Sequence, residues 1–228
     1  MIGDILAELD AKLKQEGHDF GGWVVYRCTY NSDSEWAEFK DKLQSESRRA
    51  LDNYAATDKM LEQHVLTYVG DREKLDNTTK SDVRRVFNEW VHSAEAAAEQ
   101  PNAKVIPPKT DMPRYGFCIH VDETSLRSVL DDSNWHLNLV NRHWVPEEEE
   151  EDDGGDPYDD FDYEGELTEE QLEDMRLAAI FPEIEGCTEE DVGWCKLNSG
   201  ILVGLYVDFW DPNKWYLFYT RPPQLSRS

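Results

Sequence analysis

A run of acidic residues divides this chain into parts that can and cannot form a hydrophobic core. Residues 147–174 contain 17 Asp or Glu and no Lys or Arg. Adjacent carboxylates repel one another and offer almost no apolar surface to bury. We therefore expect residues 147–166 to form a long, disordered acidic insert, and the core to come from the rest of the chain.

Most of the negative charge of the chain lies in the same acidic run. The 228 residues carry a formal charge of -26, of which only -9 remains once residues 147–174 are set aside. An acidic surface repels nucleic acid phosphates at long range and attracts cations and basic proteins. We expect no DNA binding, and we expect any partner of the insert to be a basic protein.

The apolar content shows that most of the chain must fold. Hydrophobic residues make up 39% of it and aromatic residues 11%, too much for a disordered protein. The first residues lack the basic and apolar regions of a signal peptide, and no apolar run approaches the roughly 20 residues of a membrane span. Four cysteines without CxxC spacing suggest buried thiols in a reducing compartment, so we expect a cytoplasmic or nuclear protein.

Strand and helix patterns alternate through the first half of the chain. Residues 23–30 and 64–69 are rich in β-branched and aromatic side chains, which favours strands. Ser32 and Glu35 have the spacing of a capping box and predict a helix from that point. The strand, acidic cap and helix pattern then recurs around residues 115–130.

The second half predicts further elements, less regularly. We expect strands at 137–145, 192–197 and 215–219, and a helix at 202–209. Four prolines in residues 100–113 indicate a linker. The sequence therefore predicts an α+β protein with one domain over 1–228, in which helices pack on a mixed sheet in a ferredoxin-like arrangement, single or doubled.

Motifs for common cofactors are missing from the sequence. It contains no GxxxxGK[ST], GxGxxG, GxSxG or HExxH pattern, and no Cys/His spacing that suits zinc. The acidic stretch 152–156 lacks the rest of an EF-hand frame. We expect neither a cofactor nor a specific metal site.

His120 and Asp122 lie two residues apart on a predicted strand, so their side chains share a face. A histidine near a carboxylate can serve general acid–base catalysis. The alternative is a polar pair at a strand end, in which Asp122 caps the following helix, and we favour this alternative.

Arg27 lies inside an apolar strand and therefore needs a partner, for which a carboxylate is the best candidate. A structural ion pair is the first interpretation, and an anchor for an anionic substrate is the second. Asp33, near the start of the following helix, is the candidate for substrate binding beside it.

Several carboxylates stand directly before a predicted aromatic strand. Glu189, Glu190 and Asp191 precede Trp194 in the sequence. A guanidinium ligand would suit this corner through bidentate pairing, and an acidic turn or helix cap is the simpler interpretation.

Three sequence blocks, residues 23–30, 113–122 and 185–194 with 219–223, together resemble a large group of small, mostly uncharacterised fungal proteins. This group is similar in turn to the fungal arginine-containing cyclodipeptide synthases. Those enzymes join arginine and a second amino acid, each delivered by its tRNA, into a diketopiperazine. Their DDxxE motif is not matched: the pairs at 131–132, 152–153 and 159–160 lack the Glu.

The resemblance implies a small biosynthetic enzyme of secondary metabolism with aminoacyl-tRNA as its partner. Aminoacyl-tRNA is an activated ester, so no ATP motif is needed, and the α-amine needs a base and correct positioning. The candidate catalytic residues are His120, Asp122, Glu190 and Asp191, and the candidate substrate-binding residues are Arg27, Asp33, Glu189 and Trp194. The alternative is a non-catalytic module whose acidic insert binds basic proteins.

Overall fold

The computed structural model describes residues 2–53, 57–131, 134–146 and 181–226. The chain divides into two compact units, one made of residues 1–143 and 193–228 and the other of residues 144–192. We expected one domain over 1–228, and this division assigns residues 144–192 to a unit of their own. The predicted acidic insert, 147–166, and a helix pattern at 168–180 lie outside the described residues.

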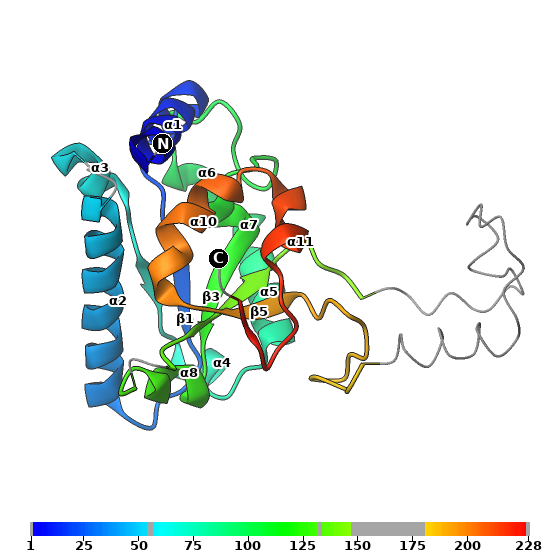
Figure 1. Ribbon diagram of the computed structural model, residues 1–228. Coiled ribbons are helices and arrows are strands. Elements are labelled where there is room, and N and C mark those ends of the chain that lie inside the picture. Colours follow the sequence, from blue (N-terminus) through cyan, green and yellow to red (C-terminus); the bar gives the residue numbers. More distant parts are fainter. Residues whose placement is uncertain (1, 54–56, 132–133, 147–180, 227–228) are drawn as a thin grey trace, which may run out of the picture. The chain divides into compact units, whose positions relative to one another are not determined.

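Within the described residues, six strands form one mixed sheet in the first unit (Figure 1). The strands are β1 (Val24–Arg27), β2 (Thr67–Val69), β3 (Phe117–Val121), β4 (Leu137–Asn141), β5 (Trp194–Leu197) and β6 (Leu225–Ser226). Their order is β2-β1-β3-β4-β5-β6. β1 is parallel to both β2 and β3, β4 is antiparallel to both of its neighbours, and β5 and β6 are parallel. The α+β class with a mixed sheet is confirmed, whereas the ferredoxin-like arrangement is not.

One face of the sheet is covered by helices from residues 72–99. These are α4 (Arg72–Leu75), α5 (Lys80–Val91) and α6 (Ala94–Glu99). The ring of Tyr26 on β1 lies 6.2 Å from that of Phe87 on α5, so the side of the sheet on which Tyr26 projects is called the α5 face.

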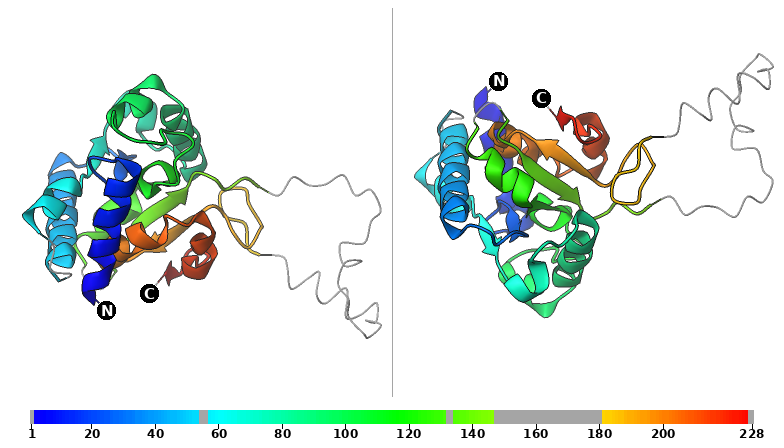
Figure 2. Two further views of the ribbon diagram at one scale, coloured as in Figure 1. Left: turned by 90° about the horizontal axis from the view of Figure 1, so that it is seen from above. Right: turned by 90° about the horizontal axis from the view of Figure 1, so that it is seen from below.

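The opposite face is covered by α1 (Ile2–Glu16), α2 (Asp33–Asn53) and α10 (Leu202–Asp208), which lie together on one side of the sheet in Figure 2. Tyr68 on β2 contacts Trp36 on α2 with ring centroids 5.8 Å apart. Phe39 is fully buried between Trp36 and Trp135. Burial of an aromatic side chain of this kind contributes about 1.5–3 kcal/mol.

Short helices complete the described chain. They are α3 (Asp58–Gln63), α7 (Pro113–Gly116), α8 (Glu123–Ser128), α11 (Trp215–Phe218) and the 3-10 turns η1 (Ser199–Ile201) and η2 (Pro212–Lys214). None of the helices in the described part of the chain is long and apolar enough to cross a membrane.

Side-chain caps explain where the two main helices after strands begin. The Ser32 hydroxyl accepts a hydrogen bond from the Glu35 N–H at 3.2 Å, as the capping box predicts. The Thr79 hydroxyl accepts one from the Asp82 N–H at 3.1 Å and starts α5. These helix starts were readable from the sequence.

The prediction of a strand at 215–219 is wrong. Asp211 caps η2 by accepting from the Asn213 N–H, and Pro212 occupies the first turn, where its fixed φ favours a helix. In α11 the side chain of Trp215 is buried, whereas Tyr216 and Leu217 are 70% and 77% exposed. Two consecutive exposed residues fit a helix and not a strand, so packing overrides the β propensity of these aromatic residues.

The proline-rich segment 100–113 packs against the first unit. Gln100 and Met112 are fully buried and Thr110 is nearly so. The amide of Gln100 donates to the Phe20 carbonyl at 2.7 Å and accepts from the Asp19 N–H at 2.8 Å. These contacts fix the segment beside the residues that precede β1.

Candidate functional site

A cleft of about 300 Å³ opens on the α5 face of the sheet. Its floor consists of alternate residues of β1 and β2, which project to one face because strand side chains alternate. Its walls come from the three helices α4, α5 and α6. The lining residues are Val24, Tyr26, Thr67, Val69, Asp71, Lys74, Leu75, Val86, Trp90, Glu95 and Glu99.

The interior of the cleft is apolar and aromatic. Val24, Val69 and Leu75 form its aliphatic surface, and Tyr26 and Trp90 supply rings. Trp90 is held by stacking on Phe87 and on Tyr115, with ring centroids 5.8 and 5.7 Å away. An apolar cleft with a few polar groups at its edge is typical of a small-molecule site.

Three carboxylates and one ammonium group line the cleft. Asp71 pairs with Lys74 at 2.9 Å, and this hydrogen bond lowers the pKa of Asp71. Glu99 is occupied by Arg114, as described below. Glu95 is exposed, and no basic side chain within the described residues pairs with it. The cleft therefore offers one uncompensated negative charge beside an apolar floor.

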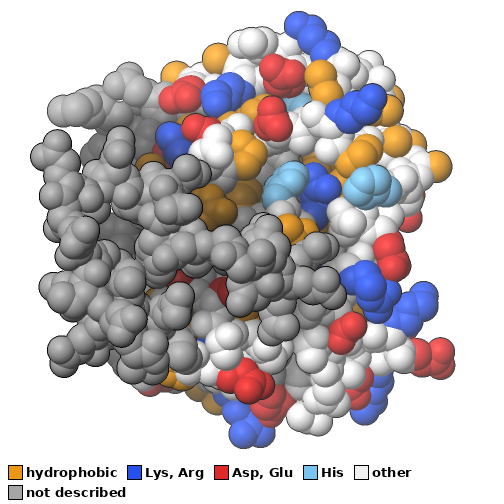
Figure 3. Space-filling model, turned by 90° about the vertical axis from the view of Figure 1, so that its right-hand side faces the viewer, with side chains coloured by type: hydrophobic (Ala, Val, Ile, Leu, Met, Phe, Trp, Pro, Cys, Tyr) orange, Lys and Arg blue, Asp and Glu red, His pale blue; other side chains and the backbone are white. Residues whose placement is uncertain are grey.

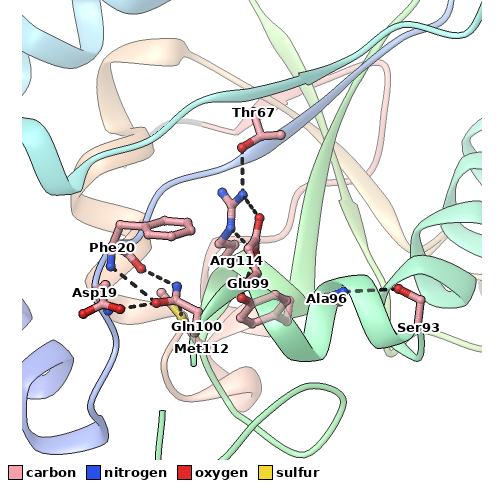
Figure 4. A network of polar contacts seen from close by, with 10 residues as sticks. Asp19, Phe20, Thr67, Ser93, Ala96, Glu99, Gln100, Met112 and Arg114 are labelled. Carbon is pink, nitrogen blue, oxygen red and sulfur yellow. Dashed lines mark hydrogen bonds and ion pairs between the residues drawn. The ribbon is translucent and has the colours of Figure 1, made fainter. Parts of the chain in front are cut away.

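The wall at Glu99 is fixed by a buried network centred on Arg114 (Figure 4). Arg114 is fully buried, and its Nε and Nη2 donate to the two oxygens of Glu99 at 2.9 and 2.6 Å. Nη2 also donates to the Thr67 hydroxyl at 2.7 Å, and the Tyr115 hydroxyl donates to Glu99 at 2.8 Å. This bidentate pair ties α6 to β2 and to the start of β3.

The charge of Arg114 also affects a histidine at the edge of the sheet. Burial, together with the charge of Arg114, lowers the pKa of His64 from 6.5 to about 4. His64 is thus neutral at physiological pH, beside Gly21 and Tyr206 in a small cavity of about 20 Å³. A cavity of that size has room for one water molecule.

The structure places His120 and Asp122 as the structural interpretation predicts. Asp122 caps α8 by accepting from the Ser125 N–H at 2.8 Å and pairs with Lys80 at 2.9 Å. Burial would raise the pKa of Asp122, but Lys80 and the Ser125 N–H outweigh it and lower that pKa far below its usual value. His120 is buried, and its Nε2 donates to the Thr78 carbonyl at 2.8 Å.

Trp194 lies in the same neighbourhood. Its ring is nearly buried on β5, and the Lys80 ammonium lies 4.6 Å from the ring centroid. Lys80 therefore bridges Trp194 and Asp122. The sequence did not single out Lys80, although it stands at the first position of a capped helix that follows a strand.

Arg27 has the carboxylate partner that the sequence predicts, and the partner is Asp33. The Nη2 of Arg27 lies 2.6 Å from the Asp33 carboxylate, and its Nε donates to the Thr29 carbonyl at 2.9 Å. Its guanidinium also lies 4.4 Å from the ring centroid of Tyr30. With Nε and Nη2 of Arg27 both engaged by protein groups, this arrangement fits the structural ion pair.

Glu189, Glu190 and Asp191 belong to the unit of residues 144–192, whereas Trp194 belongs to the first unit. Glu190 is exposed, and Glu189 and Asp191 are partly exposed. Of the eight predicted site residues, His120, Asp122 and Trp194 come together around Lys80, and Arg27 and Asp33 pair with each other.

The residues of the cleft were missed by the sequence analysis. Glu95 and Glu99 stand four apart in an alanine-rich segment, a spacing that places both on one helix face. Trp90 recurs with Val83, Val86 and Phe87 at helical spacing, a pattern that indicates core packing and not a binding site. No group of three or more His, Cys, Asp or Glu side chains suited to a metal occurs within the described residues.

Comparison with protein-family models, with curated proteins and with solved structures found no match for this chain. What it does must therefore be inferred from its own residues.

Proposed function

We propose that this protein binds a small organic cation in the cleft on the α5 face, with an apolar stem on the floor and the charge at Glu95. The observation that carries the proposal is an exposed, uncompensated carboxylate beside an aromatic and aliphatic cleft of about 300 Å³. A guanidinium group is the best fit, because its planar fork pairs with carboxylates and its hydration is weaker than that of an ammonium.

The other charges of the cleft support the same polarity. Asp71 and Glu99 each engage a single basic group, so neither Lys74 nor Arg114 is available to an anionic ligand. Buried aromatic carbon next to a carboxylate favours a cation with a hydrocarbon stem over an inorganic ion.

Calorimetric titration with n-butylguanidinium, n-butylammonium and n-butylurea tests the proposal. The urea has a similar shape but no charge. We expect butylguanidinium to bind most tightly and Glu95→Gln to weaken it about tenfold, which corresponds to about 1.4 kcal/mol. Glu38→Gln, which removes an exposed carboxylate from α2 on the opposite side of the sheet, is the matched control and should change nothing.

Two results would contradict cation binding. One is equal affinity for butylurea and butylguanidinium, which would show that only shape matters. The other is unchanged affinity in Glu95→Gln. Binding should also weaken as salt is raised, because Glu95 is exposed and its field is screened.

A more specific candidate is the synthesis of arginine-containing cyclodipeptides, which we propose on the sequence resemblance together with the guanidinium binding proposed above. In this proposal the cleft holds the arginyl side chain of an aminoacyl-tRNA. Expression in a host with ordinary tRNA pools should yield an arginine-containing diketopiperazine, and Glu95→Gln should reduce its amount. Absence of the product from a host that contains well-folded protein counts against the proposal.

Binding of tRNA by this acidic chain would need a basic face, and four arginines that stand in adjacent pairs in the sequence, Arg48 with Arg49 and Arg84 with Arg85, do not form one. Arg84 is buried and donates to the carbonyls of Asn141 and Gly193, and Arg85 pairs with Glu89 at 2.9 Å. Arg48 and Arg49 lie on α2, across the sheet from α5. In the part of Figure 3 that grey atoms do not cover, Lys and Arg alternate with Asp and Glu. These arginines therefore do not form a basic face, within the described residues, that would support tRNA binding.

A further inference from the structure

Asn138, in the middle of the sheet, is a buried amide for which the described part of the chain supplies no hydrogen-bond partner. It lies on β4, paired in register with His120 on β3 and with Lys196 on β5. The side chain is 1% exposed, and neither Oδ1 nor Nδ2 finds a partner among the described residues. Buried polar groups in native proteins are nearly always satisfied, so this amide can hydrogen-bond to a bound water or to a ligand.

His136, directly before β4 and two residues from Asn138, provides a second unsatisfied atom. Its Nδ1 lies 2.7 Å from the Asn134 carbonyl, so Nδ1 carries the proton and Nε2 presents a lone pair. Nε2 is buried and has no partner within the described residues. Burial lowers the pKa of His136, so the ring is neutral and Nε2 can accept a hydrogen bond.

Lys196 supplies a positive charge beside Asn138. It is partly exposed, and no carboxylate within the described residues pairs with it. Lys196 and Asn138 are directly paired across β5 and β4, and the charge of Lys196 adds to the effect of burial in lowering the pKa of His136. Because Lys196 reaches solvent while Asn138 does not, it marks the side from which a ligand enters.

The remaining charged groups of this area are engaged with one another. Asp122 pairs with Lys80 and caps α8, and His120 donates to the Thr78 carbonyl. Asn138, His136 and Lys196 are left to supply the binding atoms. This site is distinct from the cation cleft and does not rest on it.

We propose that Asn138, His136 and Lys196 bind a small carboxylate that carries a hydroxyl or an amine on the adjacent carbon. Lys196 and the Asn138 Nδ2–H groups donate to the carboxylate. An adjacent O–H donates to one of the two acceptors, Asn138 Oδ1 or His136 Nε2, and an adjacent amine can donate to both. A simple anion would satisfy the donors and leave the two acceptors unpaired, so the donor on the ligand is required by the chemistry of the site.

Titration of the full-length protein with L-lactate, propionate and lactamide tests this inference. Propionate lacks the hydroxyl and lactamide lacks the charge. We expect L-lactate to bind at least tenfold more tightly than either, and Asn138→Leu or Lys196→Met to reduce its affinity at least tenfold. Lys109→Met, which removes an exposed lysine elsewhere, is the matched control.

Two further readouts keep the test decisive. Asn138→Leu should have an unliganded Tm equal to or above that of the parent protein, because it removes an unsatisfied buried amide, and it should lose the rise in Tm that lactate produces. If that variant fails to fold, the ¹⁵N shift of His136 Nε2 on addition of lactate to the parent protein serves instead. The inference is overturned if lactate does not bind, if propionate binds equally well, or if the Nε2 signal does not move.

Discussion

Two arginines that pair with carboxylates are buried, Arg27 on β1 and Arg114 on α7 directly before β3, and their surroundings differ sharply. Arg114 is fully buried, and its partner Glu99 is only 22% exposed. Arg27 has a side chain that is 10% exposed, but its partner Asp33 is 89% exposed. Each arginine makes a short contact with its carboxylate, at 2.6 Å in both cases.

The difference teaches what a buried charge requires. Arg114 depends on Glu99 and Thr67, because no solvent reaches its guanidinium. Arg27 is supported by the Thr29 carbonyl and by the rings of Tyr30 and Trp36, at 4.4 and 5.2 Å. We infer that the pair of Arg114 is essential to folding and that the carboxylate of the Arg27 pair is dispensable.

Arg114→Met should have the largest effect, a loss of about 3–5 kcal/mol, because it leaves a partly buried Glu99 without its counter-charge. Urea unfolding measures the loss. The double variant Arg114→Met with Glu99→Leu should recover part of it, since both members of the pair are then apolar. A loss below about 1 kcal/mol in the single variant would show that the two pairs are equivalent after all.

The charge of Arg114 should also appear in the pH dependence of stability. The pKa of His64 is lowered to about 4, so the unfolded chain binds a proton below pH 6.5 that the folded chain does not. Stability from this group is complete above pH 6.5 and falls as the pH drops toward 4, by roughly 1.4 kcal/mol per pH unit.

His64→Gln should flatten this part of the profile, whereas His92→Gln, at an exposed histidine, should not. Urea unfolding at pH 7, 5.5 and 4.5 provides the comparison. Parallel profiles for His64→Gln and the parent protein would show that Arg114 and burial do not shift His64.

Asp33→Asn should have the smallest effect, a loss below about 1 kcal/mol, because an exposed ion pair contributes little. The same unfolding experiment measures it. Asp82→Asn is not a suitable control, because the Asp82 carboxylate accepts a hydrogen bond from the hydroxyl of Thr79, the residue that caps α5. A loss comparable to that of Arg114→Met would remove the distinction between the two arginines.

Local signals predicted the elements of this fold well. Ser32 caps the predicted helix and Asp122 caps α8, as expected, because hydrogen bonds within three residues depend only on local sequence. The segment 215–219 was predicted wrongly, since the packing of Trp215 on Phe209 and on Phe117, which is distant in sequence, decides its helix.

The candidate cleft was beyond reach of the sequence for the same reason. Tyr26 and Trp90 stand in sequence patterns that are typical of a core. The cleft that they line with the carboxylates of α6 depends on the pairing of β1 with β2, which the sequence does not show. Asn138 gave no signal either, because an amide in a strand becomes unusual only when its neighbours across the sheet are known.

Arg84 has a consequence for how this chain tolerates change. The Asn141 N–H donates to the Gly193 carbonyl at 2.9 Å, and Arg84 donates to the carbonyls of both residues at 3.0 Å. The chain thus leaves the sheet after Asn141 and returns to it at Gly193, and Arg84 hydrogen-bonds to the backbone at both points. Segments of very different length and composition can be spliced between them, since doubling a flexible loop costs only about 0.6 kcal/mol in closure entropy.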